Sequence, residues 1–245
     1  MASFIKTILK AVLITVVLII LITTMATAQD QRLNFGLTGT LAIPQGPFRD
    51  NVERLGPGIN FMFGYQFLNT PFLLGVDAGF VSFGSDERTE QLSPTIPDLR
   101  VRIRNSYNMG HGQLLLRMQG MSTNFRPFMD ALLGFNYLYT ETTLSNRNSF
   151  GEEPVLRDTN FDDWALSYGL GAGVQIKLTE FQTDAEMDGM TKPARLYLTL
   201  QTRYMLGDEA EYLNSLSTDN GTVVYDIRKS RTNLVYIQVG VTFTF

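Results

Sequence analysis

Large apolar residues alternate with small or polar residues along most of the chain beyond residue 30, and turn-rich segments interrupt the alternation. In the clearest stretch, 164–178, large apolar residues occupy nearly every second position from Trp164 to Leu178. A period of two is typical of β-strands that have one apolar and one polar face. Eight stretches of this kind predict eight strands, near residues 33–43, 59–67, 72–80, 113–118, 129–139, 164–178, 195–204 and 235–245.

The polar faces of these stretches are rich in glycine and uncharged polar residues. A soluble β-sandwich, the alternative fold, would turn its apolar faces inward and place charged residues outside. The expected strands are about 9 to 13 residues long, near the 9–11 that a tilted strand needs to cross a bilayer. Backbone groups in lipid must all be paired, so such a sheet has to close without an edge. We therefore predict an all-β, eight-stranded antiparallel up-and-down transmembrane β-barrel with a narrow, filled interior.

The connections between the stretches alternate between short and long. Segments 68–71 and 119–126 are short, and long loops are expected over 44–58, 84–112, 144–163 and 208–231. Outer-membrane barrels have short periplasmic turns and long extracellular loops, which puts both ends of the mature chain in the periplasm. Segment 179–194 departs from this pattern, because it is long for a periplasmic turn.

Aromatic residues gather at the two ends of the expected strands, where outer-membrane barrels carry rings of aromatic side chains. The periplasmic set is Tyr65, Phe67, Phe72, Phe243 and Phe245, and the outer set is Phe80, Tyr137, Tyr139, Trp164 and Tyr204. A general preference of aromatic residues for strands does not explain why they gather at matching ends.

The first 28 residues have the features of a cleavable secretory signal peptide. Lys6 and Lys10 precede an apolar run from Ala11 to Ile22, and Ala26-x-Ala28 fits a signal-peptidase site. The alternative is an uncleaved membrane anchor, but the run is shorter than the roughly 18 residues that a spanning helix needs. We therefore predict a signal peptide over residues 1–28 and one barrel domain over residues 29–245.

Composition excludes several classes of protein and of site. The chain has no cysteine, which excludes disulfides, thiolate metal sites and anchoring through a lipidated cysteine. Without Lys6 and Lys10 the mature chain has 18 basic and 24 acidic residues, and this net charge of −6 argues against nucleic-acid binding. A mean hydropathy of −0.01 and the lack of a further long apolar run exclude a helical membrane protein.

Three motifs in the chain are similar to motifs of the small outer-membrane β-barrel families of Gram-negative bacteria. They are Arg126-Pro127-Phe128 leading into 131–137, Gly169-Leu170-Gly171-Ala172-Gly173-Val174, and Val241-Thr242-Phe243-Thr244-Phe245. The chain is similar to the OmpA-like and OmpX-like barrels, and most of all to the general outer-membrane β-barrel domain common in Bacteroidetes. The resemblance implies a fold and a compartment, the bacterial outer membrane, rather than a reaction. It also implies that Phe243 and Phe245 form the signal that the barrel-assembly machinery reads.

Five charged residues fall on the polar faces of the strands, namely Asp77, Arg117, Asp130, Lys177 and Arg203. Arg117 and Asp130 flank the same short turn on neighbouring strands, so they are placed to pair. A lone charge is costly in an interior of low dielectric constant, whereas a pair is tolerated. We predict a structural ion-pair network that plugs the barrel. The alternative is a narrow pore or a small-ligand transport site.

A lipid A-modifying enzyme is a third hypothesis, because some small outer-membrane barrels carry acyl chemistry that needs a base beside a nucleophile. The sole histidine, His111, lies between Gly110 and Gly112 at the expected outer approach to the fourth strand. Such glycines indicate a bulge or turn, and no Gly-x-Ser-x-Gly motif or clear triad accompanies the histidine. We predict no catalytic residue, no metal site and no cofactor.

Arg100, Arg102 and Arg104 lie on one face of an extended segment before the fourth strand. Guanidinium groups bind phosphates through two parallel hydrogen bonds. By parity with Leu114 and Leu116 the arginines face outward, level with lipopolysaccharide head groups, unless a bulge at one of the nearby glycines reverses them. The alternative is a solvated hairpin arm.

Together these features predict a monomeric, non-enzymatic barrel of the bacterial outer membrane. Its role is expected to be structural or a surface interaction made by the extracellular loops, since binding sites on rigid scaffolds usually lie in loops. The expected partners are outer-membrane lipid and lipopolysaccharide, the barrel-assembly machinery and an unidentified surface ligand.

Overall fold

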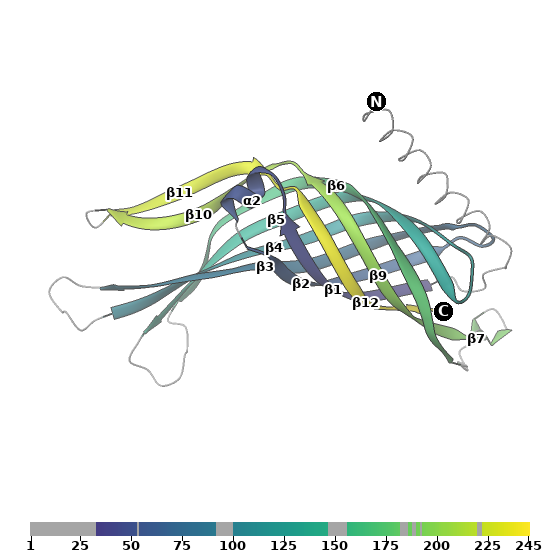
Figure 1. Cartoon of the computed structure of the whole chain (residues 1–245). Helices are drawn as coiled ribbons and strands as arrows, with labels where there is room; N and C mark the ends of the chain where they lie inside the picture. The colour runs from purple at the N-terminus through teal and green to yellow at the C-terminus, as the bar shows by residue number, and fades with distance from the viewer. Residues whose placement is uncertain are drawn as a thin grey trace, which may run out of the picture.

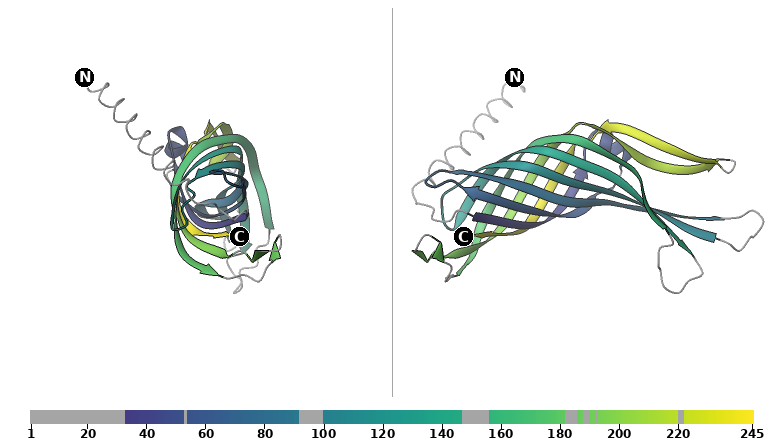
Figure 2. Two further views of the ribbon diagram at one scale, coloured as in Figure 1. Left: turned by 90° about the vertical axis from the view of Figure 1, so that its right-hand side faces the viewer. Right: turned by 180° about the vertical axis from the view of Figure 1, so that it is seen from behind.

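The computed structural model describes residues 33–52, 54–91, 100–146, 156–181, 186–187, 190–191, 193–219 and 222–245. Within them, eight antiparallel strands form a closed barrel in the order β1, β12, β9, β6, β5, β4, β3 and β2 (Figures 1 and 2). The strands are β1 Leu33–Pro44, β2 Gly56–Gln66, β3 Phe72–Gln91, β4 Arg100–Gln119, β5 Phe125–Asn146, β6 Leu156–Phe181, β9 Ala194–Gly207 and β12 Leu234–Thr244. The predicted eight-stranded fold is confirmed, and the predicted signal peptide lies outside the described residues.

The large apolar residues of the alternating stretches point outward, and the polar residues between them point into the interior. On β2, for example, Phe61 and Phe63 are exposed whereas Asn60 is buried. Glutamine, asparagine and threonine fill the interior in the same way on the other strands, as Gln175 and Gln238 do on β6 and β12. In a membrane the exposed apolar surface is covered by lipid, so the two faces meet two different solvents.

Four strands are much longer than a bilayer crossing requires. β3, β4, β5 and β6 contain 20, 20, 22 and 26 residues, whereas about 9–11 suffice to cross. They continue as a paired sheet beyond the barrel, at the end opposite the C-terminus (Figure 1). The prediction of loops over 84–112 and 144–163 is therefore wrong for the described parts of those segments. Both faces of a sheet outside the bilayer meet water, so no lipid-facing apolar surface is required there, while the backbone pairing continues.

The segment 208–231, predicted as a loop, also forms strands. β10 (Glu209–Asp219) and β11 (Thr222–Arg231) pair as an antiparallel hairpin beyond the same end of the barrel (Figure 1). Two hydrogen bonds hold its base to β6. The Asp208 N–H donates to the Leu166 carbonyl at 2.8 Å, and the Glu211 N–H donates to Asp163 Oδ2 at 2.8 Å.

The two ends of the barrel differ in their connections. Segments 67–71 and 120–124 are short turns at the end where the C-terminus lies, which marks that end as periplasmic. The longer periplasmic segment contains the two-residue strands β7 (Glu186–Met187) and β8 (Met190–Thr191). At the outer end the short helix α2 (Pro47–Asn51) joins β1 to β2. Among the described residues, no helix has the length and hydrophobicity needed to cross a membrane.

β1 and β12 close the barrel along a seam that pairs residues from Asn34–Thr244 to Pro44–Leu234. Beyond the last pair, Leu33 and Phe245 exchange both backbone hydrogen bonds, with N···O distances of 3.1 and 2.9 Å. The ring of Phe245 meets that of Phe35 edge-on at 6.1 Å between centroids, and Phe35 contacts Phe63 at 4.9 Å. The terminal residue therefore completes the seam and belongs to an aromatic cluster on the outer surface.

Deleting Phe245 removes the last hydrogen-bonded pair of the seam and one ring of that cluster. We expect a smaller fraction of folded barrel in outer-membrane preparations, measured as the heat-dependent mobility shift on a denaturing gel. Phe245→Tyr keeps the backbone bonds and the ring, so it should behave like the unaltered chain. A deletion variant that reaches the normal folded fraction would contradict this role of the seam.

Candidate functional site

Two arginines and two aspartates form a charged cluster in the barrel interior. Arg203 donates to both oxygens of Asp77 at 2.8 and 3.0 Å, and Arg117 donates to both oxygens of Asp130 at 2.7 and 2.9 Å. Arg203 also reaches Asp130 at 3.4 Å, which joins the two pairs. All four side chains are at most 2% exposed. Each carboxylate is held by charge-assisted hydrogen bonds and the cluster has no net charge, so its burial is tolerated.

The strand order explains how this cluster crosses the barrel. Arg117 on β4 and Asp130 on β5 are direct cross-strand partners, as their positions beside one turn predict. Asp77 on β3 and Arg203 on β9 lie four strands apart in the ring of eight, so their ion pair spans the interior. The sequence predicts that both residues face inward. It does not predict that they pair, because they are far apart along the chain.

His111 belongs to the interior rather than to the outer approach where the sequence analysis placed it. It lies within β4 and is almost fully buried, with its ring 5.5 Å from that of Tyr236. Asn60 Nδ2 donates to Asp77 at 3.0 Å, which turns Asn60 Oδ1 toward His111 Nε2 at 2.9 Å. A carboxylate only accepts hydrogen bonds, so Asp77 fixes the orientation of the Asn60 amide, which presents its oxygen to His111 Nε2. Within the described residues, no three His, Cys, Asp or Glu side chains are grouped to hold a metal ion.

A layer of amides and hydroxyls links the charged cluster to the seam strands. Gln201 accepts a hydrogen bond from Arg117 at 3.2 Å and donates to Gln238 at 2.6 Å. Gln238 in turn donates to the hydroxyl of Thr40 on β1 at 2.9 Å. The interior hydrogen bonds therefore join β4, β9, β12 and β1 without a break.

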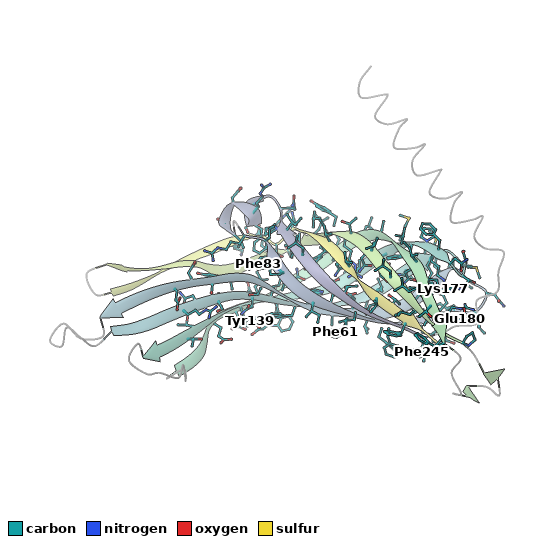
Figure 3. The ribbon with its side chains drawn as sticks, turned by 60° about the horizontal axis from the view of Figure 1, so that its bottom comes forward. Phe61, Phe83, Tyr139, Lys177, Glu180 and Phe245 are labelled. Carbon is teal, nitrogen blue, oxygen red and sulfur yellow. The ribbon has the colours of Figure 1, made fainter. Side chains whose placement is uncertain are left out.

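Lys177 does not join this network, which corrects the prediction that grouped it with the other four charges. Its Nζ lies 3.4 Å from Glu180 Oε2, and Arg195 Nε lies 3.1 Å from the same oxygen. Figure 3 shows Lys177 beside Glu180 at the end of the barrel that carries Phe245. Lys177 pairs in register with the buried Tyr197, so it keeps the inward parity of β6, but it lies at the periplasmic rim, away from the charged cluster.

An apolar layer fills the outer part of the interior. Phe48 from α2 is 1% exposed and packs edge-on against Phe83 at 5.7 Å between ring centroids. The layer also contains Ala42, Val81, Met109, Leu138, Ala165, Met205, Leu234 and Tyr236. The alternation along the sequence does not identify these residues, because they occupy positions that it assigns to the polar face.

The periplasmic end of the interior is covered by aromatic and cationic side chains. The guanidinium of Arg126 lies 4.4 Å from the ring centroid of Tyr197, and its Nε donates to the Ser122 carbonyl at 2.8 Å. The Tyr197 hydroxyl donates to the Thr123 carbonyl at 3.0 Å, which ties the β4–β5 turn to β9. This end of the barrel is therefore also occupied by protein.

The described part of the interior contains a small void. A void of about 10 Å³ lies beside the charged cluster, with Thr38, Arg117, Thr199 and Gln201 among its lining residues. Thr38 Oγ1 and Arg117 Nη1 have no hydrogen-bond partner among the described residues. A polar void of this size suits one ordered water molecule, and it is too small for a solute larger than water.

Arg104 lies on the outer part of β4 and is exposed, as the parity of the strand predicts. Its Nε donates to Ser85 Oγ at 3.0 Å. The register of β4 does not shift at Gly110 or Gly112; the irregularity lies in β3, between Ser82 and Ser85. Arg100 and Arg102 belong to β4 by backbone, but their side chains lie outside the described residues.

Several solved structures resemble the chain at low sequence identity. Neisserial surface protein A is 12% identical, with 89% of this chain and 99% of that chain covered and a TM-score of 0.41. Ail of Yersinia pestis, solved with the heparin analogue sucrose octasulfate, is 13% identical over 88% and 97% of the two chains, with a TM-score of 0.31. The outer-membrane protease OmpT of Escherichia coli is 9% identical over 89% and 98%, with a TM-score of 0.33. No curated protein matches the chain.

The family comparison covers most of the sequence. A model of the outer membrane protein beta-barrel domain matches residues 14–192. This match spans the first strands of the barrel, including the residues of the charged cluster on β3, β4 and β5. The chain therefore belongs to the outer membrane protein beta-barrel domain family and is an integral protein of the outer membrane.

Proposed function

We propose that the protein is a non-conducting, non-enzymatic barrel with a structural or surface-interaction role, which it performs through the strands beyond the bilayer. The single observation that supports this proposal best is the filled interior. An ionic cluster, an amide layer and an apolar layer occupy it, and the void beside the cluster measures about 10 Å³. A narrow pore or a solute carrier needs a continuous passage, and a filled interior favours a closed barrel over both.

The outer strands supply the surface for such an interaction. β3–β6 extend well past the barrel and the β10–β11 hairpin stands beside them (Figure 2). The Arg54 guanidinium fastens the β1–β2 connection to this sheet, since it donates to the Ser85 carbonyl at 3.3 Å and to Asp86 Oδ1 at 2.6 Å. Binding residues lie disproportionately on surface segments that a rigid scaffold positions.

Burial of the sole histidine supports a non-enzymatic role. A base for acyl chemistry must reach a nucleophile and a substrate at the lipid-facing outer rim. His111 is instead enclosed, hydrogen-bonded to Asn60 and packed on Tyr236. Its remaining ring nitrogen, Nδ1, is also buried and has no protein partner in the described part of the chain.

The expected partners follow from the surfaces of the barrel. Its outward apolar residues contact outer-membrane lipid, and the exposed Arg104 is suited to a phosphate of lipopolysaccharide. Phe243 and Phe245 at the end of β12 suit recognition by the barrel-assembly machinery, and a monomer is the expected state.

Conductance in planar lipid bilayers tests the closed barrel. We expect no current steps from the purified, folded protein, because protein side chains fill the described interior from both ends. Arg117→Ala should also be silent, since Leu73 and Leu115 lie fully buried near the removed side chain and the outer apolar layer is unchanged. Steady current steps from the unaltered protein would overturn the proposal in favour of a pore.

The structural role of the ionic cluster is tested by unfolding. Arg203→Met leaves Asp77 without its ion pair, and removing one partner of a buried pair lowers the free energy of unfolding by about 3–5 kcal/mol. The double variant Arg203→Met, Asp77→Asn should recover part of this loss. Lys229→Ala, at an exposed ion pair, is the control with a change of about 1 kcal/mol or less. Urea titration of the heat-dependent mobility shift measures all three, and an unchanged Arg203→Met variant would exclude the structural role.

Contact with lipopolysaccharide is tested at Arg104. Arg104→Ser should lower the amount of lipopolysaccharide that the purified barrel retains in detergent by about two- to five-fold, because an exposed ion pair contributes about 1 kcal/mol or less. The difference should disappear at high salt, which screens exposed charges. Lys229→Ser is the matched control on the hairpin. Equal retention by the Arg104 and Lys229 variants at low salt would remove Arg104 from the contact.

A further inference from the structure

An apolar groove lies on the lipid-facing surface of the barrel, across β12, β1, β2 and β3. Its volume is about 300 Å³. Phe35 and Phe63 form one wall with Phe243, and Phe61 rises beside it on β2. Figure 3 shows Phe61 and Phe245 along this side of the barrel. The residues that line the groove carry no charged group and no side-chain amide or hydroxyl.

The strand register explains why the surface is hollow at this point. Leu37, Phe61 and Ala78 are neighbours in one cross-strand row, and Phe35, Phe63 and Val76 form the next row toward the periplasm. Ala78 presents only a methyl group between larger side chains. Its neighbour on β4 is Gly112, and a Cβ added there would meet no atom within 4 Å. The surface therefore drops from the rings of Phe61 and Phe63 toward β3 and β4.

The depth of the groove in the membrane decides what fills it. Phe243 and Phe245 lie at the periplasmic end of the barrel. At this level the girdle of aromatic side chains around a barrel contacts the lipid head groups. The groove begins at this level and runs toward the middle of the bilayer. A peptide inserted there would leave unpaired backbone groups in lipid, and each such group is costly. Hydrocarbon is the material that meets an apolar lining at this depth without such a cost.

We propose that the groove seats one acyl chain of a phospholipid from the periplasmic leaflet. The proposal is independent of the outer surface and of the closed interior, because the groove lies on the outside of the barrel. Aromatic rings suit such a seat, since they offer large, rigid contact surfaces that lose little conformational freedom on binding. If the surrounding lipid left the groove empty, the side chains that line the groove would lose dispersion contacts.

Spin-labelled phospholipid in vesicles containing the folded barrel tests the proposal. The electron paramagnetic resonance spectrum separates motionally restricted lipid from mobile lipid. Ala78→Phe fills the hollow and should reduce the restricted fraction per barrel. Ala131→Phe adds the same side chain at another exposed, lipid-facing position, between Leu116 and Leu170, and should leave that fraction unchanged. Heat-dependent mobility shifts confirm that both variants are folded before the spectra are compared.

The other outcomes each overturn the proposal. Equal restricted fractions in the two variants would show a uniform lipid shell. A dimer of the unaltered protein that Ala78→Phe converts to a monomer, seen by sedimentation in detergent, would assign the groove to a second copy of the chain. Displacement of the restricted phospholipid by added lipopolysaccharide would assign the groove to an acyl chain from the outer leaflet.

Discussion

Every backbone N–H and C=O that lies in the hydrocarbon core has to find its hydrogen-bond partner within the protein. The pairing of β1 with β12, completed by the reciprocal bonds between Leu33 and Phe245, meets this requirement at the one place where strands distant in sequence must join. Closure at eight strands also fixes a narrow interior. The interior charges, the amide layer and the apolar layer are all consequences of having to fill that space with side chains.

The transmembrane part of the fold was predictable because its two faces meet different solvents. The alternation on β2 and β12 predicts apolar side chains toward lipid and polar side chains toward the interior. The structure confirms that Phe61 points outward and that Gln238 points inward. Beyond the bilayer β3 and β4 meet water on both sides. Residues 84–91 show no hydrophobic alternation, and the short alternation over 100–104 predicted only an extended segment within a loop. The pairing that continues there depends on backbone hydrogen bonds, which leave little trace in the sequence.

The interior was predictable residue by residue but not as an assembly. Parity alone placed Asp77, Arg117, Asp130 and Arg203 inside, but parity does not predict depth, and Lys177 lies at the rim, where it contacts Glu180 instead of the cluster. It gave no reason to expect the Arg203–Asp77 pair, because contact across a closed ring depends on which strands face each other. Phe83 and Met109 were not predicted as apolar filling for a related reason. A period of two predicts which face of the strand a residue occupies. It does not predict the depth in the barrel at which apolar side chains replace polar ones.

The order of these layers explains how one chain combines a charged interior with a closed barrel. The buried cluster has no net charge and is fully enclosed, so its attraction acts in a medium of low dielectric constant. The Arg203–Asp77 pair joins β9 to β3 across the diameter of the barrel, and the Arg117–Asp130 pair joins the neighbouring strands β4 and β5. Apolar filling by Phe48 and its neighbours then excludes water at the outer end, where it would otherwise screen those pairs. The cluster and the apolar layer therefore depend on each other: water let in past Phe48 would weaken the ion pairs, and loss of the ion pairs would leave charges that draw water in.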